Sequence, residues 1–145
     1  MRITSSVLEK EQYIPQKYTC NGAGISPPLE IEDIPPEAVS LVLVMDDPDA
    51  PGGTFTHWLV WNVSADTSKI EENSLPAGAV EGINSSGEVG YYPPCPPSGV
   101  HRYFFRLYAL KDQIDLESGA QRSKLEEAMA PFVVGSASFM KKCAA

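Results

Sequence analysis

Both histidines of this chain lie near other residues that can bind an anion or transfer a proton. His57 follows soon after Asp47 and Asp49, and His101 is followed closely by Tyr103. Imidazole, carboxylate and phenol groups carry most general acid–base chemistry, and imidazoles also bind metals. Either histidine alone is explained as simply by hydrogen bonds to backbone groups at a strand end. The chemistry therefore depends on whether the fold brings these side chains together.

The elements that must position these residues are predicted to be strands. An aliphatic run at 41–47 stops at Pro48, which cannot donate to a β-ladder, and further apolar runs follow at 54–63 and 101–110. Each run has apolar residues on both faces, which is typical of strands in a sandwich interior. Weaker strand signals occur at 1–8, 29–34 and 133–140.

Alternation along these strands predicts which side chains share a face. Asp47 should follow Met45 on one face and end it with a carboxylate. An antiparallel return would carry His57 to the same rim, and the third run begins with His101 beside a proline-rich loop. The expected faces are Phe55, His57, Leu59 and Trp61 on the second run, and His101, Tyr103, Phe105 and Leu107 on the third.

The remainder of the chain predicts one short helix and a long irregular segment. Ser123 and Glu126 have the spacing of a capping box, good helix formers occupy 124–129, and Pro131 should end the helix. The segment 64–97 reads as an irregular excursion, which in a small domain often carries function. The predicted fold is a single, mainly all-β domain over 1–145. It is an antiparallel Greek-key β-sandwich with one short peripheral helix and long irregular loops.

Composition limits the partners and the setting. The net charge of −8 repels nucleic acid, and no Lys/Arg cluster favours docking on an anionic membrane. No stretch reaches the length of a membrane span and the first residues lack the apolar core of a signal peptide, so we expect a cytoplasmic protein without membrane insertion. The three cysteines, Cys20, Cys95 and Cys143, have irregular spacings that favour a reducing compartment, and a domain of this size should fold without a covalent cross-link.

Three sequence blocks together resemble the phosphatidylethanolamine-binding protein family, in its bacterial and archaeal Raf-kinase-inhibitor-like branch. They are Asp47-Pro48-Asp49-Ala50-Pro51, His57-Trp58-Leu59-Val60-Trp61-Asn62 and Pro96-Pro97-Ser98-Gly99-Val100-His101-Arg102-Tyr103. Three blocks in order are far more specific than one. The resemblance implies a pocket for phosphate-like groups or phosphorylethanolamine, lined by Asp47, Asp49, Pro51, His57, Pro97, His101 and Tyr103.

Two departures from the family pattern affect this expectation. The rim loop, where related sequences have more glycine, reads Gly90-Tyr91-Tyr92-Pro93-Pro94-Cys95-Pro96-Pro97, which is bulkier and stiffer and should restrict ligand size. The sequence also ends soon after the last predicted strand, without room for the C-terminal helix near the pocket of animal members, so kinase regulation does not carry over directly. Because Asp47 and Asp49 repel an anion, we expect a zwitterionic ligand or an Asp-supported protonated histidine.

We expect a binding protein with no catalytic residues, no metal and no cofactor, and two other classes compete with this interpretation. An enzyme would need a metal on His57, His101 and an aspartate, or a nucleophile pair of Cys95 with His101. An interaction module would recognise a phosphorylated segment or inhibit a protease, with a kinase or protease as its partner. The resemblance also predicts a homodimer.

Overall fold

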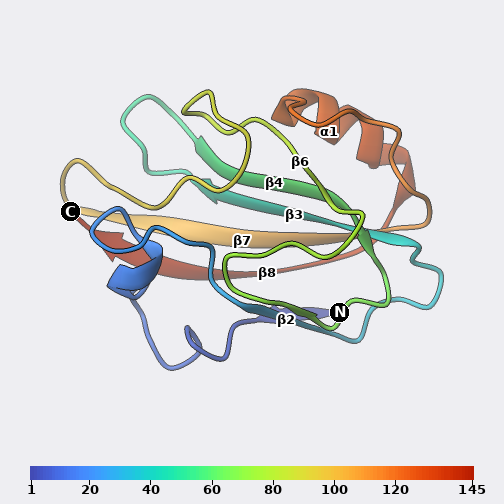
Figure 1. Cartoon of the computed structure of the whole chain (residues 1–145), viewed down its shortest axis with the longest axis horizontal. Helices are drawn as coiled ribbons and strands as arrows, with labels where there is room; N and C mark the ends of the chain where they lie inside the picture. Colours follow the sequence, from blue (N-terminus) through green and yellow to red (C-terminus); the bar gives the residue numbers. More distant parts are fainter.

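The three strong apolar runs form the centre of a five-stranded antiparallel sheet in the computed structural model, which describes residues 1–145 (Figure 1). The central strands begin and end close to the predicted limits. In sheet order the strands are β6 (Val80–Glu81), β4 (Phe55–Ser64), β3 (Ser40–Asp47), β7 (Val100–Leu110) and β8 (Val133–Ala144).

The large sheet contains the predicted Greek key. Strands β3, β4 and β6 follow one another across the sheet, and β7 returns beside β3 to give the spatial order β7-β3-β4-β6. A smaller sheet has the order β1 (Arg2–Thr4), β2 (Leu29–Glu32), β5 (Lys69–Ile70), and its pairs are also antiparallel. The helical elements are α1 (Arg122–Met129) and two 3₁₀ turns, η1 (Gln16–Tyr18) and η2 (Ala130–Phe132).

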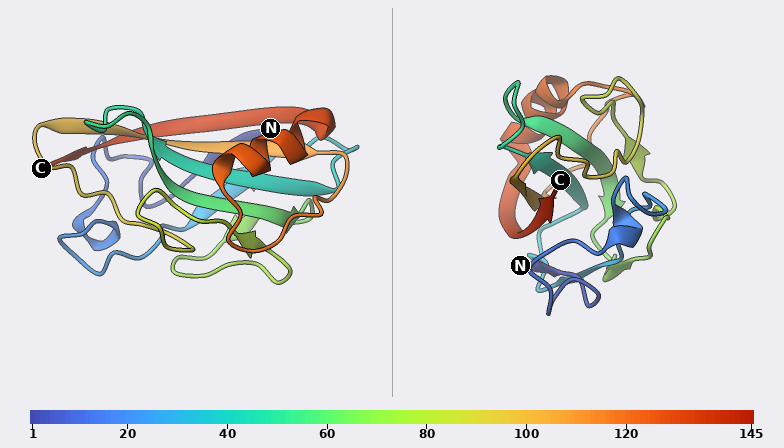
Figure 2. Two further views of the ribbon diagram at one scale, coloured as in Figure 1. Left: turned by 90° about the horizontal axis from the view of Figure 1, so that it is seen from above. Right: turned by 90° about the vertical axis from the view of Figure 1, so that its left-hand side faces the viewer.

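The large sheet is covered on both faces, which explains why β3 is buried along its whole length. One face packs against the small sheet, where Leu43, Met45 and Phe105 meet Ile3 and Leu29. Helix α1 lies over the opposite face (Figure 2). There the apolar contacts are Val42, Val44, Leu59, Trp61, Leu125 and Met129. None of the helices is both long and apolar enough to cross a membrane.

The prediction that His57 shares a face with Leu59 and Trp61 is wrong. Met45 pairs with Trp58 and Asp46 pairs with Thr56, so His57 is the additional residue of a β-bulge in β4. A bulge interrupts the alternation of side chains beyond it. His57 therefore lies on the face of Asp47, whereas Leu59 and Trp61 pack on the helix side.

The predicted capping box at Ser123 is also wrong. Helix α1 begins at Arg122, and the backbone carbonyl of Gln121 accepts the first helical hydrogen bonds from Lys124 and Leu125. The Arg122 guanidinium contacts the buried Asp46 carboxylate at 2.9 Å and donates to Thr56 Oγ1 at 3.1 Å. This ion pair attaches the first turn of the helix to the sheet, a contact that local sequence does not reveal.

The cysteine spacings favoured a reducing compartment, but the structure joins Cys20 and Cys95 in a disulfide. Their Cα atoms are 5.4 Å apart although 75 positions separate them in the sequence. Their irregular spacing gave no signal because the fold, and not the sequence interval, brings them together. Cys143 remains a free, buried thiol.

Breaking this cross-link should destabilise the protein. In the chain-entropy model a loop of this size contributes roughly 4 kcal/mol to the free energy of unfolding. We expect the double variant Cys20→Ser/Cys95→Ser to unfold at a lower denaturant concentration than the wild type, followed by circular dichroism without reductant. A reductant should lower the wild-type midpoint and leave that of the double variant unchanged; equal midpoints for both proteins without reductant would contradict the prediction.

Candidate functional site

A cavity of about 190 Å³ lies at the rim where β3 ends, β4 begins and β7 begins. The structure brings together every sequence-predicted site residue except Asp49. The predicted residues in the cavity wall are Asp47, Pro51, His57, Pro97, His101 and Tyr103. Strand pairing explains the gathering, because β3 is antiparallel to both β4 and β7 and the three strands therefore meet at this rim.

Asp47 and His101 form a buried pair in this wall. Nδ1 of His101 lies 2.7 Å from Oδ2 of Asp47, and the two residues are only 7% and 3% exposed. The backbone N–H of Asp49 donates to the other carboxylate oxygen at 2.8 Å. Because a carboxylate accepts, Nδ1 of His101 donates to it and Nε2 is the ring nitrogen left for a ligand.

His57 is held differently. Its Nδ1 lies 2.7 Å from the backbone carbonyl oxygen of Tyr92, and its ring packs against Phe55 and edge-on against Tyr103, with centroids 4.7 and 5.2 Å away. Burial lowers the pKa of His57 below its ordinary value; the Tyr92 carbonyl and the charges of Asp47 and Asp46 oppose this shift, while His101 reinforces it. The two imidazoles are therefore held differently: burial favours the neutral form of His57, whereas Nδ1 of His101 donates to a carboxylate.

Asp49 lies outside the cavity wall and binds Arg102 instead. Nε and Nη2 of Arg102 donate to the two oxygens of Asp49 at 2.9 Å each, and the backbone N–H of Arg102 adds a third bond at 2.9 Å. These hydrogen bonds lower the pKa of Asp49 to about 2. The family resemblance implied a place in the pocket for Asp49, but in the structure this residue connects the β3–β4 turn to β7.

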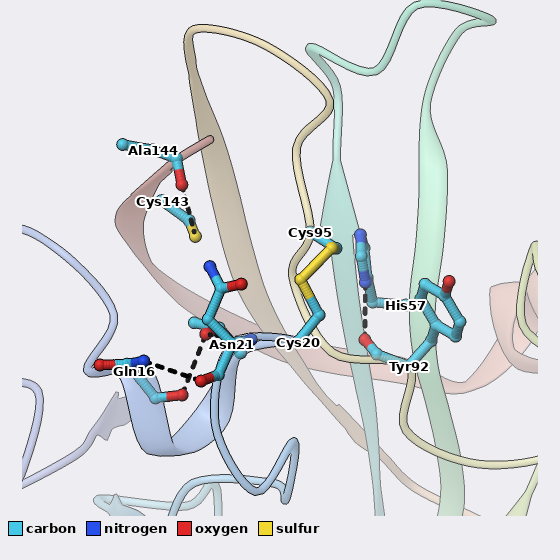
Figure 3. Close-up of a disulfide and its surroundings, with 9 residues drawn as sticks. Gln16, Cys20, Asn21, His57, Tyr92, Cys95, Cys143 and Ala144 are labelled. Atoms are coloured by element: carbon cyan, nitrogen blue, oxygen red, sulfur yellow. Dashed lines mark hydrogen bonds between the residues drawn. A yellow bond between two sulfur atoms is a disulfide. The ribbon is translucent and has the colours of Figure 1, made fainter.

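The rim loop from Tyr92 to Pro97 is fastened at several points (Figure 3). The backbone N–H of Tyr92 donates to the His57 carbonyl at 2.9 Å, reciprocating the bond from the imidazole. Cys95 is joined to Cys20, and the backbone N–H of Cys20 donates to Pro94 at 3.1 Å. The cavity wall is therefore positioned by covalent and backbone bonds as well as by proline.

Sequence reasoning did not assign five of the residues that line the cavity: Ala50, Phe55, Tyr92, Cys95 and Pro96. Phe55 was detectable, because it alternates with His57 at the start of the strand. Ala50 and Pro96 stand inside the quoted blocks. Tyr92 and Cys95 were placed in the rim loop, and Cys95 was weighed as a nucleophile, but nothing local shows that the loop folds back over β4 to bring both residues into the wall.

The structure bears on the two catalytic arrangements weighed from the sequence. The sulfur of Cys95 is bonded to the sulfur of Cys20, so Cys95 has no free thiol that could act as a nucleophile. No group of three or more His, Cys, Asp or Glu side chains is arranged to bind a metal ion. Burial, reinforced by the charge of Asp47, raises the pKa of Tyr103, so its hydroxyl stays protonated.

Comparison with known proteins gives one consistent family. The family model described as phosphatidylethanolamine-binding protein matches residues 4–143. A UPF0098 protein of Methanothermobacter thermautotrophicus is 49% identical over 142 residues, covering 94% of each chain. A UPF0098 protein of Chlamydia trachomatis is 43% identical over 145 residues, covering 97% of this chain and 96% of the relative.

Solved structures agree with the sequence matches. A Chlamydia trachomatis protein described as a phosphatidylethanolamine-binding protein homologue superposes with a TM-score of 0.95 at 42% identity, covering 99% of this chain and 97% of the other. E. coli YbcL, described as a new member of the mammalian family, superposes with a TM-score of 0.92 at 26% identity, covering 99% of this chain and 98% of the other.

The lowered pKa of His57 should make stability depend on pH. Below the ordinary value of 6.5 an unfolded His57 takes up a proton while the folded one stays neutral, so the unfolded state binds more protons. Above pH 6.5 His57 is neutral in both states and does not reduce the free energy of unfolding. As the pH falls from 6.5 toward the lowered pKa, the unfolded state gains the proton first and the free energy of unfolding decreases. We expect His57→Asn to lose less stability than the wild type between about pH 7.5 and 5.5, by at most about 1.4 kcal/mol per pH unit.

Chemical denaturation across this pH range provides the measurement. Lys111→Asn changes an exposed residue and should follow the wild-type pH profile. Parallel profiles for the wild type and His57→Asn would show that His57 does not resist protonation in the folded protein.

Proposed function

Because this chain belongs to the phosphatidylethanolamine-binding protein family, we propose that its cavity binds a small phosphate-type group, free or as part of a zwitterionic head group. The observation that carries this proposal is the buried Asp47–His101 pair in the cavity wall. When His101 takes up a proton, its Nε2–H donates to an anionic oxygen while Asp47 balances the charge at Nδ1.

The charges around the cavity are compatible with an anion despite the acidic composition. Asp49 is neutralised by Arg102, and Asp46 is paired on the helix side of the sheet with Arg106 and Arg122 at 3.1 and 2.9 Å. Asp47 is the single carboxylate that lines the cavity. An ammonium end of a zwitterionic ligand would interact favourably with the remaining negative charge.

The size of the cavity favours a head group over a whole lipid. Its volume of about 190 Å³ is below the roughly 300 to 1,000 Å³ of pockets that hold drug-sized ligands. The proline-rich rim loop limits expansion of the cavity, because Tyr92 is hydrogen-bonded to His57 and Cys95 is joined to Cys20. We therefore propose binding of the phosphoryl group and its immediate substituent, with no catalytic step.

Phosphate binding should strengthen as the pH falls, because the donor at His101 requires a proton. A histidine-resolved NMR titration should show saturable shifts of both imidazoles with inorganic phosphate and with phosphorylethanolamine, and higher affinity at about pH 6 than at pH 8. Affinity that stays constant from pH 5.5 to 8 would refute proton-linked binding. A phosphopeptide that binds much more tightly than phosphorylethanolamine would instead favour a protein partner.

Removing His101 should have a specific effect on this binding. His101→Asn can still donate to Asp47 but lacks the Nε2 donor, and we expect at least a tenfold loss of phosphate affinity. Lys111→Asn removes one positive charge at an exposed position away from the cavity wall and should bind as the wild type does. Equal losses in both variants would show that general charge, and not the pocket, attracts phosphate.

A further inference from the structure

The two histidines of the cavity offer a ligand opposite hydrogen-bonding groups. A backbone carbonyl can only accept, so the 2.7 Å contact with Tyr92 requires Nδ1 of His57 to carry the proton. A neutral imidazole protonated at Nδ1 has a lone pair at Nε2. In Figure 3 that second ring nitrogen points away from Tyr92. His57 therefore presents an acceptor, whereas His101 presents a donor once it is charged.

The burial of His57 among aromatic side chains favours its neutral form. Phe55 of its own strand and Tyr103 of β7 pack against the ring, and Tyr92 contributes an aromatic ring 6.0 Å away. The charged or titratable groups that act on it are Asp46 and Asp47 of β3 and His101 of β7. Burial outweighs the two carboxylates and lowers the pKa of His57.

Apart from the Tyr92 and Tyr103 hydroxyls, which can donate or accept, the rest of the cavity wall offers few side-chain donors. Pro51, Pro96 and Pro97 have no N–H, and no lysine or arginine lines the cavity. Asp47 is an acceptor that already receives bonds from His101 and from the Asp49 N–H. A ligand that only accepts hydrogen bonds would place an oxygen lone pair against the lone pair of His57 Nε2.

We propose that, among free tetrahedral anions, the pocket selects phosphate species that carry an O–H and discriminates against anions without one, such as sulfate. The ligand's O–H donates to Nε2 of His57, while another of its oxygens accepts from Nε2–H of His101. Inorganic phosphate retains an O–H near neutral pH, but sulfate does not. This inference rests on the proposed function and adds the protonation state of the ligand as its basis of selection.

The first experiment compares phosphate with sulfate at pH 7 and matched ionic strength, by titration calorimetry. We expect phosphate to bind at least tenfold more tightly, because a buried acceptor left without its partner weakens binding by about that factor. His57→Asn retains an N–H for the Tyr92 carbonyl and removes Nε2, so the ratio of the two affinities should fall toward one. In His101→Asn both affinities should fall while phosphate remains preferred.

The outcomes separate this inference from the proposed function. If the wild type bound phosphate and sulfate with equal affinity, and both anions shifted the NMR signals of His101, selection by protonation would be overturned and anion binding would remain supported. Failure of both anions to bind would overturn both proposals. A long-range ¹H–¹⁵N spectrum of the free wild type gives a test that needs no variant: the expected signal is His57 protonated at Nδ1 only, and a proton at Nε2 would overturn the inference.

Discussion

The hydrogen bond between Asp47 and His101 connects the end of β3 to the beginning of β7, and the candidate site depends on it. The two residues are 54 positions apart, and both are almost fully buried. A carboxylate removed from water at this depth requires partners, and His101 and the Asp49 N–H provide them. Because the same pair lines the cavity, the interaction that satisfies the buried charge also fixes the orientation of the His101 ring in the cavity wall.

Two other aspartates near this rim are compensated in different ways. Asp46 points to the helix side of the sheet, where Arg106 makes two hydrogen bonds to its carboxylate and Arg122 of α1 adds an ion pair. Asp49 receives three bonds from Arg102. Alternation along β3 separates Asp46 from Asp47, so neighbouring carboxylates in the sequence act on opposite faces of the sheet. The cavity is left with one carboxylate.

The rim of the cavity is preorganised by hydrogen bonds and by the disulfide. His57 and Tyr92 exchange two hydrogen bonds, between the imidazole and a carbonyl and between the two backbones. The disulfide fixes the position of Cys95 beside them. A wall that is already ordered loses little conformational entropy when a ligand binds. It also fixes which ring nitrogen of His57 carries the proton, a property that a mobile loop would not impose.

The sequence by itself determined the central strands, the mainly β architecture and most of the polar residues at the rim. Apolar runs that end at Pro48 or begin at a proline-rich loop are local patterns, and the three family blocks contain Asp47, His57 and His101 in order. Local patterns sufficed because strand propensity and burial act on neighbouring residues.

Only the tertiary structure decided the face of His57, the partner of Asp49 and the pairing of Cys20 with Cys95. The β-bulge at His57 depends on the register of β4 against β3. Asp49 lies outside the cavity because β7 places Arg102 beside it. The start of α1 depends in the same way on the sheet residue Asp46. These features arise from contacts between segments distant in sequence, whose geometry exists only after the chain has folded.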